Sequence, residues 1–210
     1  MKILNLYAGI GGNRKLWGDN HEITAVEFVP EIAAIYKDFF PNDKVIIADA
    51  HEYLLNHYKE FDFIWSSPPC PTHSQVRKIS TGENMIGRAG GAKPVFPDMK
   101  LYEEILFLQG YFKGLWCVEN VVSWYEPLIP PNNIAKHYFW TNFLLREFTG
   151  AGRNHHGDIS SLSETKGFDL SPYKGIDKRK ILRNCVEPEL GKHILDLAIN
   201  PIKLQKELTF

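Results

Sequence analysis

KILNLYAGIGG, residues 2–12, decides the fold, because a short apolar run ends abruptly at three glycines. A strand that runs into Gly9, Gly11 and Gly12 lets the backbone bend sharply and approach a ligand closely, since glycine has no Cβ atom. A nicotinamide-dinucleotide fingerprint would place its third glycine at position 14, which is Arg14 here. The stretch therefore predicts a first strand followed by a ligand-binding turn of another kind.

Strand and helix signals alternate after this turn. We expect strands at 23–28, 44–48, 61–66 and 114–119, a strand pair within 137–145, and helices at 30–40, 50–58, 99–112 and 188–205. Residues 71–98 are typical of a long loop, and residues 150–180, rich in Gly, Ser, Lys and His, indicate weak structure. The alternation predicts an α/β fold with a doubly wound, mostly parallel sheet, in which ligands bind at the carboxyl ends of the strands.

The composition predicts one globular domain over residues 1–210 with a local basic bias. The chain is 44% apolar with a net charge of −1, but residues 71–100 carry five Lys/Arg against two Asp/Glu, and residues 150–185 carry seven against four. A polyanion would therefore meet the middle and late segments. Three cysteines without metal-like spacing, and no apolar run long enough for a bilayer, indicate a cytoplasmic protein with no metal and no membrane partner.

Acidic residues mark the ends of the next two strands. Glu27 ends the second predicted strand, where a carboxylate can accept both hydroxyls of a ribose, and Phe28 beside it can stack on adenine. Asp49 ends the third, where it can accept from the adenine amino group. Together with the glycine turn, these positions favour S-adenosylmethionine as the cofactor.

Two further motifs follow the fourth and fifth predicted strands. SSPPCPTHS, residues 66–74, holds Cys70 behind two prolines at the start of the long loop, where a substrate can reach the thiol. CVENV, residues 117–121, places Glu119 at the end of a strand on the same edge of the sheet. A carboxyl group there can hydrogen-bond the N3 and N4 edge of cytosine. Cys117 and Cys185 are expected to be buried structural cysteines.

In this order, YAGIGG, Glu27, Asp49, PPC and ENV resemble the cytosine-5 DNA methyltransferase family, in a short, phage-like form. The resemblance implies a Rossmann-like methyltransferase fold, S-adenosylmethionine as cofactor and duplex DNA as partner, with a cytosine flipped into the pocket. It implies that the Cys70 thiolate adds to C6 and that Glu119 binds or protonates N3. It also implies a cytoplasmic location in a bacterial or phage-infected cell.

The resemblance carries further roles onto matching positions. The cofactor-binding residues it implies are Tyr7, Ala8, Gly9, Ile10, Gly11, Gly12, Glu27, Phe28, Asp49, Ala50, Pro69 and Leu101, with His193 and Ile194 from a C-terminal helix that returns to the cofactor. The nucleic-acid contacts it implies are Ser74, Gln75, Arg77 and Lys78 after the catalytic cysteine, and Arg153, Lys178 and Arg179 in a reduced recognition loop at 150–185.

The chain departs from the family pattern at several points. Pro71 stands where the family usually has Gln after PPC, and Gly191-Lys192 stands where it has Gly-Asn. The QxRxR strand, whose last arginine holds the cytosine O2, is replaced by NNIAKHYFW, which leaves Lys136 or His137 as the nearest basic substitute. Only about forty residues separate this strand from the last helix, whereas a full recognition domain needs roughly a hundred.

Four functional interpretations stay open at this point. The leading one is a minimal DNA cytosine-5 methyltransferase with short or relaxed specificity. An RNA cytosine-5 methyltransferase is the second, although the Cys-Phe-Thr segment of the transfer-RNA enzymes is missing. The third is a non-catalytic binding module, or the catalytic half of a two-subunit enzyme that needs a separate recognition partner. The fourth keeps the attack by Cys70 with another one-carbon donor, against which Glu27 and Asp49 argue. The oligomeric state and the target site are not predicted.

Overall fold

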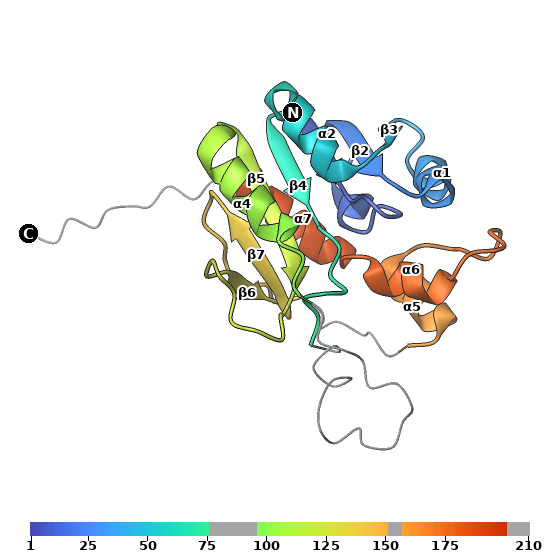
Figure 1. Ribbon diagram of the computed structural model, residues 1–210. Helices are drawn as coiled ribbons and strands as arrows, with labels where there is room; N and C mark the ends of the chain where they lie inside the picture. The colour runs from blue at the N-terminus through green and yellow to red at the C-terminus, as the bar shows by residue number, and fades with distance from the viewer. Residues whose placement is uncertain (76–95, 151–156, 201–210) are drawn as a thin grey trace, which may run out of the picture.

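The computed structural model describes residues 1–75, 96–150 and 157–200, and within them seven strands form a single mixed sheet (Figure 1). Its order is β3-β2-β1-β4-β5-β7-β6. The parallel strands are β1 (Lys2–Leu6), β2 (Glu22–Glu27), β3 (Lys44–Ile47), β4 (Phe63–Ser66) and β5 (Leu115–Val121). The expected α/β fold with a mostly parallel sheet is confirmed, and the first five strands all appear.

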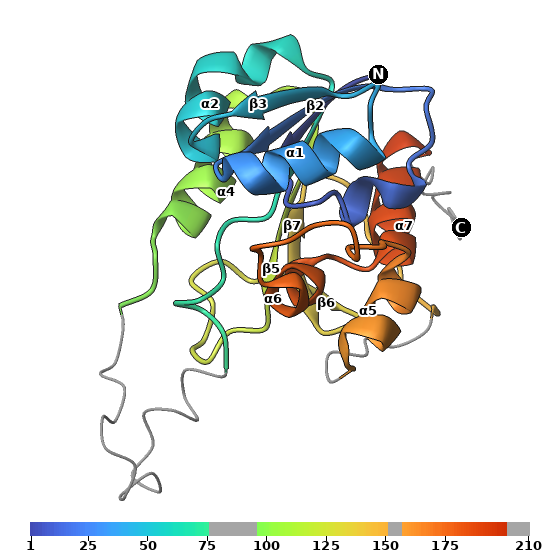
Figure 2. The ribbon, with the colours of Figure 1, turned by 90° about the vertical axis from the view of Figure 1, so that its right-hand side faces the viewer.

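Helices cover both faces of this sheet. One face carries α2 (Ala50–His57) and α4 (Lys100–Tyr111), and the other carries α1 (Pro30–Phe39) and α7 (Pro188–Ile199), as Figures 1 and 2 show. Leu54 and Leu108 pack on the first face with Leu4 and Ile64, whereas Ile194 packs on the second with Ile3. The predicted C-terminal helix is therefore present to Ile199, and residues beyond 200 lie outside the described part.

Local sequence chemistry fixes where several helices begin. Pro30 is the first residue of α1, where its missing N–H costs no helical hydrogen bond. Asp49 caps α2 by accepting from the backbone N–H of Glu52 at 3.0 Å. Because Asp49 lies two residues beyond β3, the cap places its carboxylate at the carboxyl edge of the sheet rather than on the strand itself.

Two expectations about the second half of the chain are wrong. The strand pair is a hairpin of β6 (Asn132–Ile134) and β7 (His137–Thr141), so it begins before residue 137 rather than lying within 137–145. Ala135 and Lys136, with φ of 50° and 64°, form the two-residue turn. Because β6 pairs antiparallel with β7 across this turn, NNIAKHYFW is two strands rather than one.

The segment expected to be weakly structured contains two helices, α5 (Ile159–Lys166) and α6 (Lys178–Asn184). Asp158 caps α5, which ends at the left-handed Gly167, and Asp177 caps α6. Their apolar residues share a core with α1: Leu162, Phe168, Leu170 and Leu182 are buried with Ile35 and Tyr36. The polar composition predicted weak structure wrongly, because a few apolar residues are enough to pack so short a segment against an existing helix.

Candidate active site

The glycine turn lies at the carboxyl edge of the sheet, directly after β1. Tyr7, Gly9 and Gly11 have φ of 54°, 55° and 86°, a left-handed region that favours glycine. A Cβ atom on Gly9 would meet nothing within 4 Å, so open space lies beside this part of the turn. The turn therefore leaves room for a ligand beside Gly9, as the sequence predicted.

Glu27, at the end of β2, holds this turn in place. One carboxylate oxygen accepts from the backbone N–H of Gly9 and the other from that of Val29, both at 2.9 Å. The neighbouring Phe28 is 69% exposed, so its ring is accessible beside the turn. An acid that shapes the turn next to an exposed aromatic ring fits the expected recognition of a ribose and an adenine.

Other predicted cofactor residues lie in different surroundings. Gly12 and Ile10 are buried, and a Cβ atom on Gly12 would lie 2.5 Å from the carbonyl oxygen of Val186. Gly12 therefore serves packing against the C-terminal segment. Ile194 is fully buried in the core, and His193 contacts the carbonyl oxygen of Arg146 at 3.2 Å. The predicted cofactor roles of these residues stay predictions.

A buried acid beneath the turn escaped the sequence analysis. Glu104, in α4, is fully buried and accepts from Tyr7 Oη at 2.6 Å and from Ser66 Oγ at 2.5 Å. His51 Nδ1 lies 3.1 Å away, and this hydrogen bond raises the pKa of His51. Burial and the Glu104 carboxylate raise the pKa of Tyr7 well above its usual range. The cluster joins the ends of β1 and β4 to α2 and α4, close to the predicted Ala50 and Leu101.

The loop of Cys70 and the strand of Glu119 meet at the same edge. β4 and β5 are in parallel register, with Ser66 beside Val118, so both motifs begin at the same level. Asn120 Nδ2 donates to the carbonyl oxygen of Pro68 at 2.9 Å, which ties the two motifs directly together. The edge shared by the glycine turn, Cys70 and Glu119 is the site that the sequence predicted.

The cysteines divide as expected into one accessible and two buried thiols. Cys70 is half-buried, whereas Cys117 and Cys185 are buried. Burial, together with the Glu119 carboxylate, raises the pKa of Cys117 well above its usual range, and burial raises the pKa of Cys185 to about 12. The two buried thiols therefore stay protonated at neutral pH, and Cys70 stays the candidate nucleophile among the three cysteines.

The residues that follow Cys70 are fastened to the loop after β5. His73 is buried, and its Nδ1 lies 2.6 Å from Tyr125 Oη, while Trp124 Nε1 donates to the carbonyl oxygen of Thr72 at 3.0 Å. Ser74 forms an isolated bridge with Ser123. Of the predicted nucleic-acid contacts, Ser74 and the exposed Gln75 lie here, whereas Arg77, Lys78 and Arg153 lie outside the described residues.

His137 and Lys136, the two proposed substitutes for the family arginine, have different environments. His137 is buried, and its Nδ1 makes a short contact with Glu119 Oε1 across the antiparallel β5–β7 pair. Its Nε2 lies 3.5 Å from Glu187 Oε2. Lys136 is exposed in the hairpin turn. His137 is therefore in hydrogen-bonding contact with the predicted catalytic carboxyl group of Glu119, whereas Lys136 points away from the core in the hairpin turn.

Comparison with known proteins gives a family match for the first part of the chain. Residues 1–88, which include the glycine turn, Glu27, Asp49 and Cys70, match the family model of C-5 cytosine-specific DNA methylases. Over this part the chain is similar to the C-5 cytosine-specific DNA methylase family. This methylase relationship confirms the resemblance seen in the sequence motifs, and with it S-adenosylmethionine as the expected cofactor. No curated protein matches the chain.

Solved structures show a similar fold. The Entamoeba histolytica methyltransferase EhMeth is 10% identical with a TM-score of 0.51, and the match covers 95% of this chain and 98% of that one. A mutant of Spodoptera frugiperda DNMT2 is 26% identical with a TM-score of 0.39, and the match covers 57% of this chain. The match spans 35% of the DNMT2 chain, about a third of its length. The EhMeth match confirms the methyltransferase fold.

Proposed function

We propose that this methylase relative transfers a methyl group from S-adenosylmethionine to carbon 5 of cytosine in DNA, with Cys70 as the nucleophile. The observation that carries the proposal is the hydrogen bond from Asn120 to Pro68, because it fastens the strand of Glu119 to the loop of Cys70. Both lie at the sheet edge that also carries the glycine turn and Glu27. A nucleophile, an acid and a cofactor turn at one edge are what the reaction requires.

The chain's own residues divide the work as follows. Bound S-adenosylmethionine supplies the methyl group. Glu27 and the Gly9 turn would hold its ribose, Phe28 would stack on the adenine, and Asp49 would accept from the adenine amino group. The target cytosine leaves the duplex, because neither face of a stacked base is open to attack. The Cys70 thiolate adds to C6, while the carboxyl of Glu119 donates to N3 so that negative charge does not accumulate on the ring.

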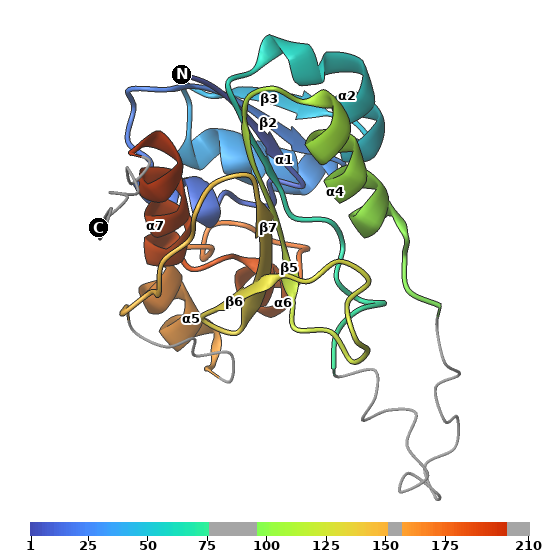
Figure 3. The same cartoon turned by 90° about the vertical axis from the view of Figure 1, so that its left-hand side faces the viewer.

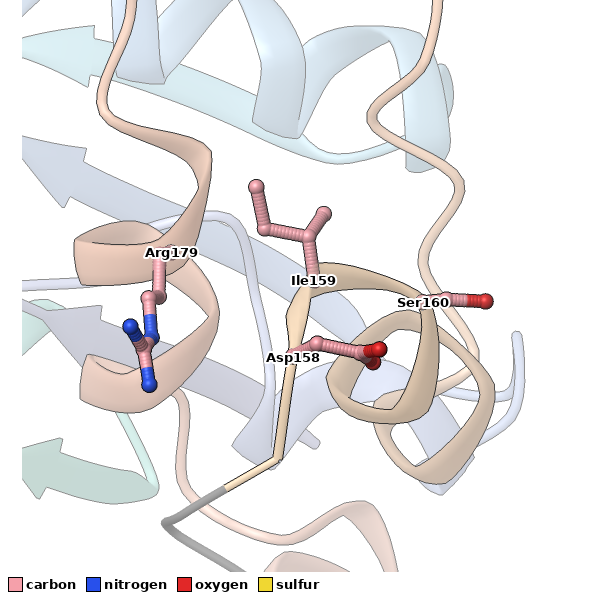
Figure 4. A pocket seen from close by; sticks show the side chains of 4 residues that line it. All are labelled: Asp158, Ile159, Ser160 and Arg179. Atoms are coloured by element: carbon pink, nitrogen blue, oxygen red, sulfur yellow. The ribbon is translucent and has the colours of Figure 1, made fainter.

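The α5–α6 segment is the proposed reduced recognition element. Arg179, Lys180 and Arg183 are exposed on α6, and within the described ranges none of them forms an ion pair. Arg179 lines a shallow pocket with Asp158, Ile159 and Ser160 at the start of α5 (Figure 4). Figure 2 shows both helices below α1. An exposed basic helix of this kind suits contacts with DNA phosphates.

The catalytic proposal is tested with labelled S-adenosylmethionine, duplex DNA and, in parallel, transfer RNA. We expect 5-methylcytosine in DNA, its loss in Cys70→Ser, and its retention in Cys117→Ala, which changes a buried thiol. Label in transfer RNA alone would overturn the DNA assignment and favour the RNA alternative. Cofactor binding without any methyl transfer would overturn the solitary enzyme and favour a partner subunit that supplies recognition.

The recognition proposal is tested through the salt dependence of DNA binding. Replacing Arg179 and Arg183 by Ala should flatten the slope of log affinity against log salt by about 1–2, since each phosphate contact contributes about 0.9. Lys59→Ala serves as the control, because Lys59 is exposed beside Tyr58 and away from α6. An unchanged slope in the double variant would exclude α6 from the DNA interface.

A further inference from the structure

Four charged or titratable side chains form a buried line from the C-terminal part of the chain to the proposed catalytic acid. Lys166 Nζ donates to Glu187 Oε1 at 2.7 Å and to the carbonyl oxygen of Cys185 at 2.7 Å. Glu187 Oε2 lies 3.5 Å from His137 Nε2, and His137 Nδ1 contacts Glu119 Oε1. The side chains are 1%, 12%, 2% and 8% exposed in that order, so solvent screens them little.

The line draws on separate elements of the fold. Lys166 ends α5, Glu187 precedes α7, His137 begins β7, and Glu119 lies in β5. Figure 3 shows β5 and β7 with α5 and α7 beside them. The packing of these elements thus brings residues that are distant in the sequence close to Glu119.

The geometry defines the charge on the imidazole. Each ring nitrogen of His137 faces a carboxylate oxygen, Nδ1 toward Glu119 and Nε2 toward Glu187. Glu187 is paired with Lys166, so Nε2 needs a proton to face its carboxylate. Glu119 becomes a carboxylate once its proton has left, and from that point Nδ1 needs a proton as well, because a bare nitrogen facing a carboxylate is repelled. Lys166 holds Glu187 in place, and among residues 1–75, 96–150 and 157–200 the protonated Cys117 thiol of β5 also lies near Glu119.

We propose that His137, held as an imidazolium between Glu119 and Glu187, positions Glu119 and stabilises the carboxylate that forms there when its proton passes to cytosine N3. The inference rests on the proposed function. It also replaces the earlier expectation that His137 binds the cytosine O2, because both ring nitrogens already face carboxylates.

The step balances without another reactant. As the Cys70 sulfur forms its bond to C6, the C5–C6 π pair moves to C4–C5, and the C4–N3 π pair takes up the Glu119 proton at N3. His137 keeps both protons and donates to Glu119 Oε1 throughout. When C5 accepts the methyl group, N3 returns its proton to Glu119 and the C4–N3 double bond forms again.

Because histidine titrates where arginine does not, the arrangement gives methyl transfer a dependence on pH. Activity should fall as pH rises and His137 loses its second proton. His137→Asn keeps an N–H donor near the Nδ1 position but carries no charge. We expect this variant to lose about 10-fold in kcat, because a hydrogen bond from a charged donor is roughly twice as strong as one from a neutral donor. Cofactor affinity should be unchanged, and the part of the alkaline decline that His137 causes should disappear. His57→Asn, at an exposed position on α2, is the matched control.

Glu187→Gln provides a second variant should His137→Asn fail to fold. Removing one of the two carboxylates weakens the hold on the imidazolium, so the alkaline decline should move to lower pH. Histidine 15N NMR of the wild-type protein gives a readout that needs no activity. We expect protons on both ring nitrogens of His137 at neutral pH, with the resonances assigned from the His137→Asn spectrum.

The outcomes separate the inference from the function on which it rests. A bare ring nitrogen at neutral pH, or a His137→Asn variant with wild-type kcat and pH profile in an active enzyme, overturns the role of His137 and leaves the methyl transfer standing. A wild type that methylates no nucleic acid overturns the proposed function and this inference with it.

Discussion

Tyr7→Phe should weaken both the fold and the binding of the cofactor. Tyr7 is not a glycine, yet its φ is 54°, which costs about 1–2 kcal/mol for a residue with a Cβ atom. Its hydroxyl donates to the buried Glu104 at 2.6 Å, and a hydrogen bond to a charged group contributes about 1.5–3 kcal/mol. The bond therefore offsets the backbone strain at the first residue of the glycine turn.

Without the hydroxyl, Glu104 keeps Ser66 and His51 as donors, but the strain at residue 7 is no longer offset. We expect the free energy of unfolding to fall by about 1.5–3 kcal/mol in urea titrations. The cofactor Kd should rise about 5- to 30-fold in calorimetric titrations, because a strain of 1–2 kcal/mol depletes the competent turn by that factor. Tyr111→Phe, at an exposed tyrosine of α4, is the control. A Tyr7→Phe protein as stable and as tight-binding as the wild type would refute the reasoning.

Three further substitutions test other parts of the framework. His51→Gln should lower the free energy of unfolding most in acid. Glu104 raises the pKa of His51 above 6.5, so the histidine stabilises the fold fully below pH 6.5, and this stabilisation is lost as pH rises through the raised pKa. Urea unfolding of both proteins at about pH 5.5 and about pH 9 measures the difference. Arg14→Met should cost about 3–5 kcal/mol in urea unfolding, because it removes the cationic partner of the buried Asp43, at 2.9 Å, and leaves that carboxylate with the Tyr36 hydroxyl. An Arg14→Met, Asp43→Leu protein should lose less, and equal losses would contradict this account. Gly12→Ala should cost about 1–3 kcal/mol in thermal unfolding, because its Cβ would lie 2.5 Å from the Val186 carbonyl oxygen, whereas Gly110→Ala in α4, where a Cβ meets nothing within 4 Å, should be neutral or stabilising.

The first half of the fold was predictable because each element there carries a local signal. Apolar runs end at glycines, prolines or acids, and Pro30 and Asp49 mark helix starts by their own chemistry. The hairpin was misread because its turn consists of Ala135 and Lys136, which adopt φ of 50° and 64° without the Gly or Asn that such turns usually show.

The site was only partly predictable, for a different reason. Cys70, Glu27 and Glu119 stand in motifs at predicted strand ends, and the resemblance to a known family singled them out. Glu104 lies in the apolar pattern of α4, and Glu187 in a short link before α7, where an acid usually means solvent. Their roles depend on partners 38 and 50 residues away, Ser66 and His137, which single-sequence patterns do not pair.

The α5–α6 segment shows how so short a chain could recognise DNA without a separate recognition domain. Its buried residues pack on α1 rather than around a core of their own, so the segment is an added layer of the methyltransferase fold and not a separate domain. Its outward basic residues are few, and a bidentate base contact occupies one side chain per base. Such a surface can hold phosphates firmly and read only a short site.

The same segment is linked to the proposed acid, because Lys166 connects the end of α5 to Glu119 through Glu187 and His137. The segment that would meet the DNA is therefore also the one that orders Glu119, and shortening it would cost catalysis as well as binding.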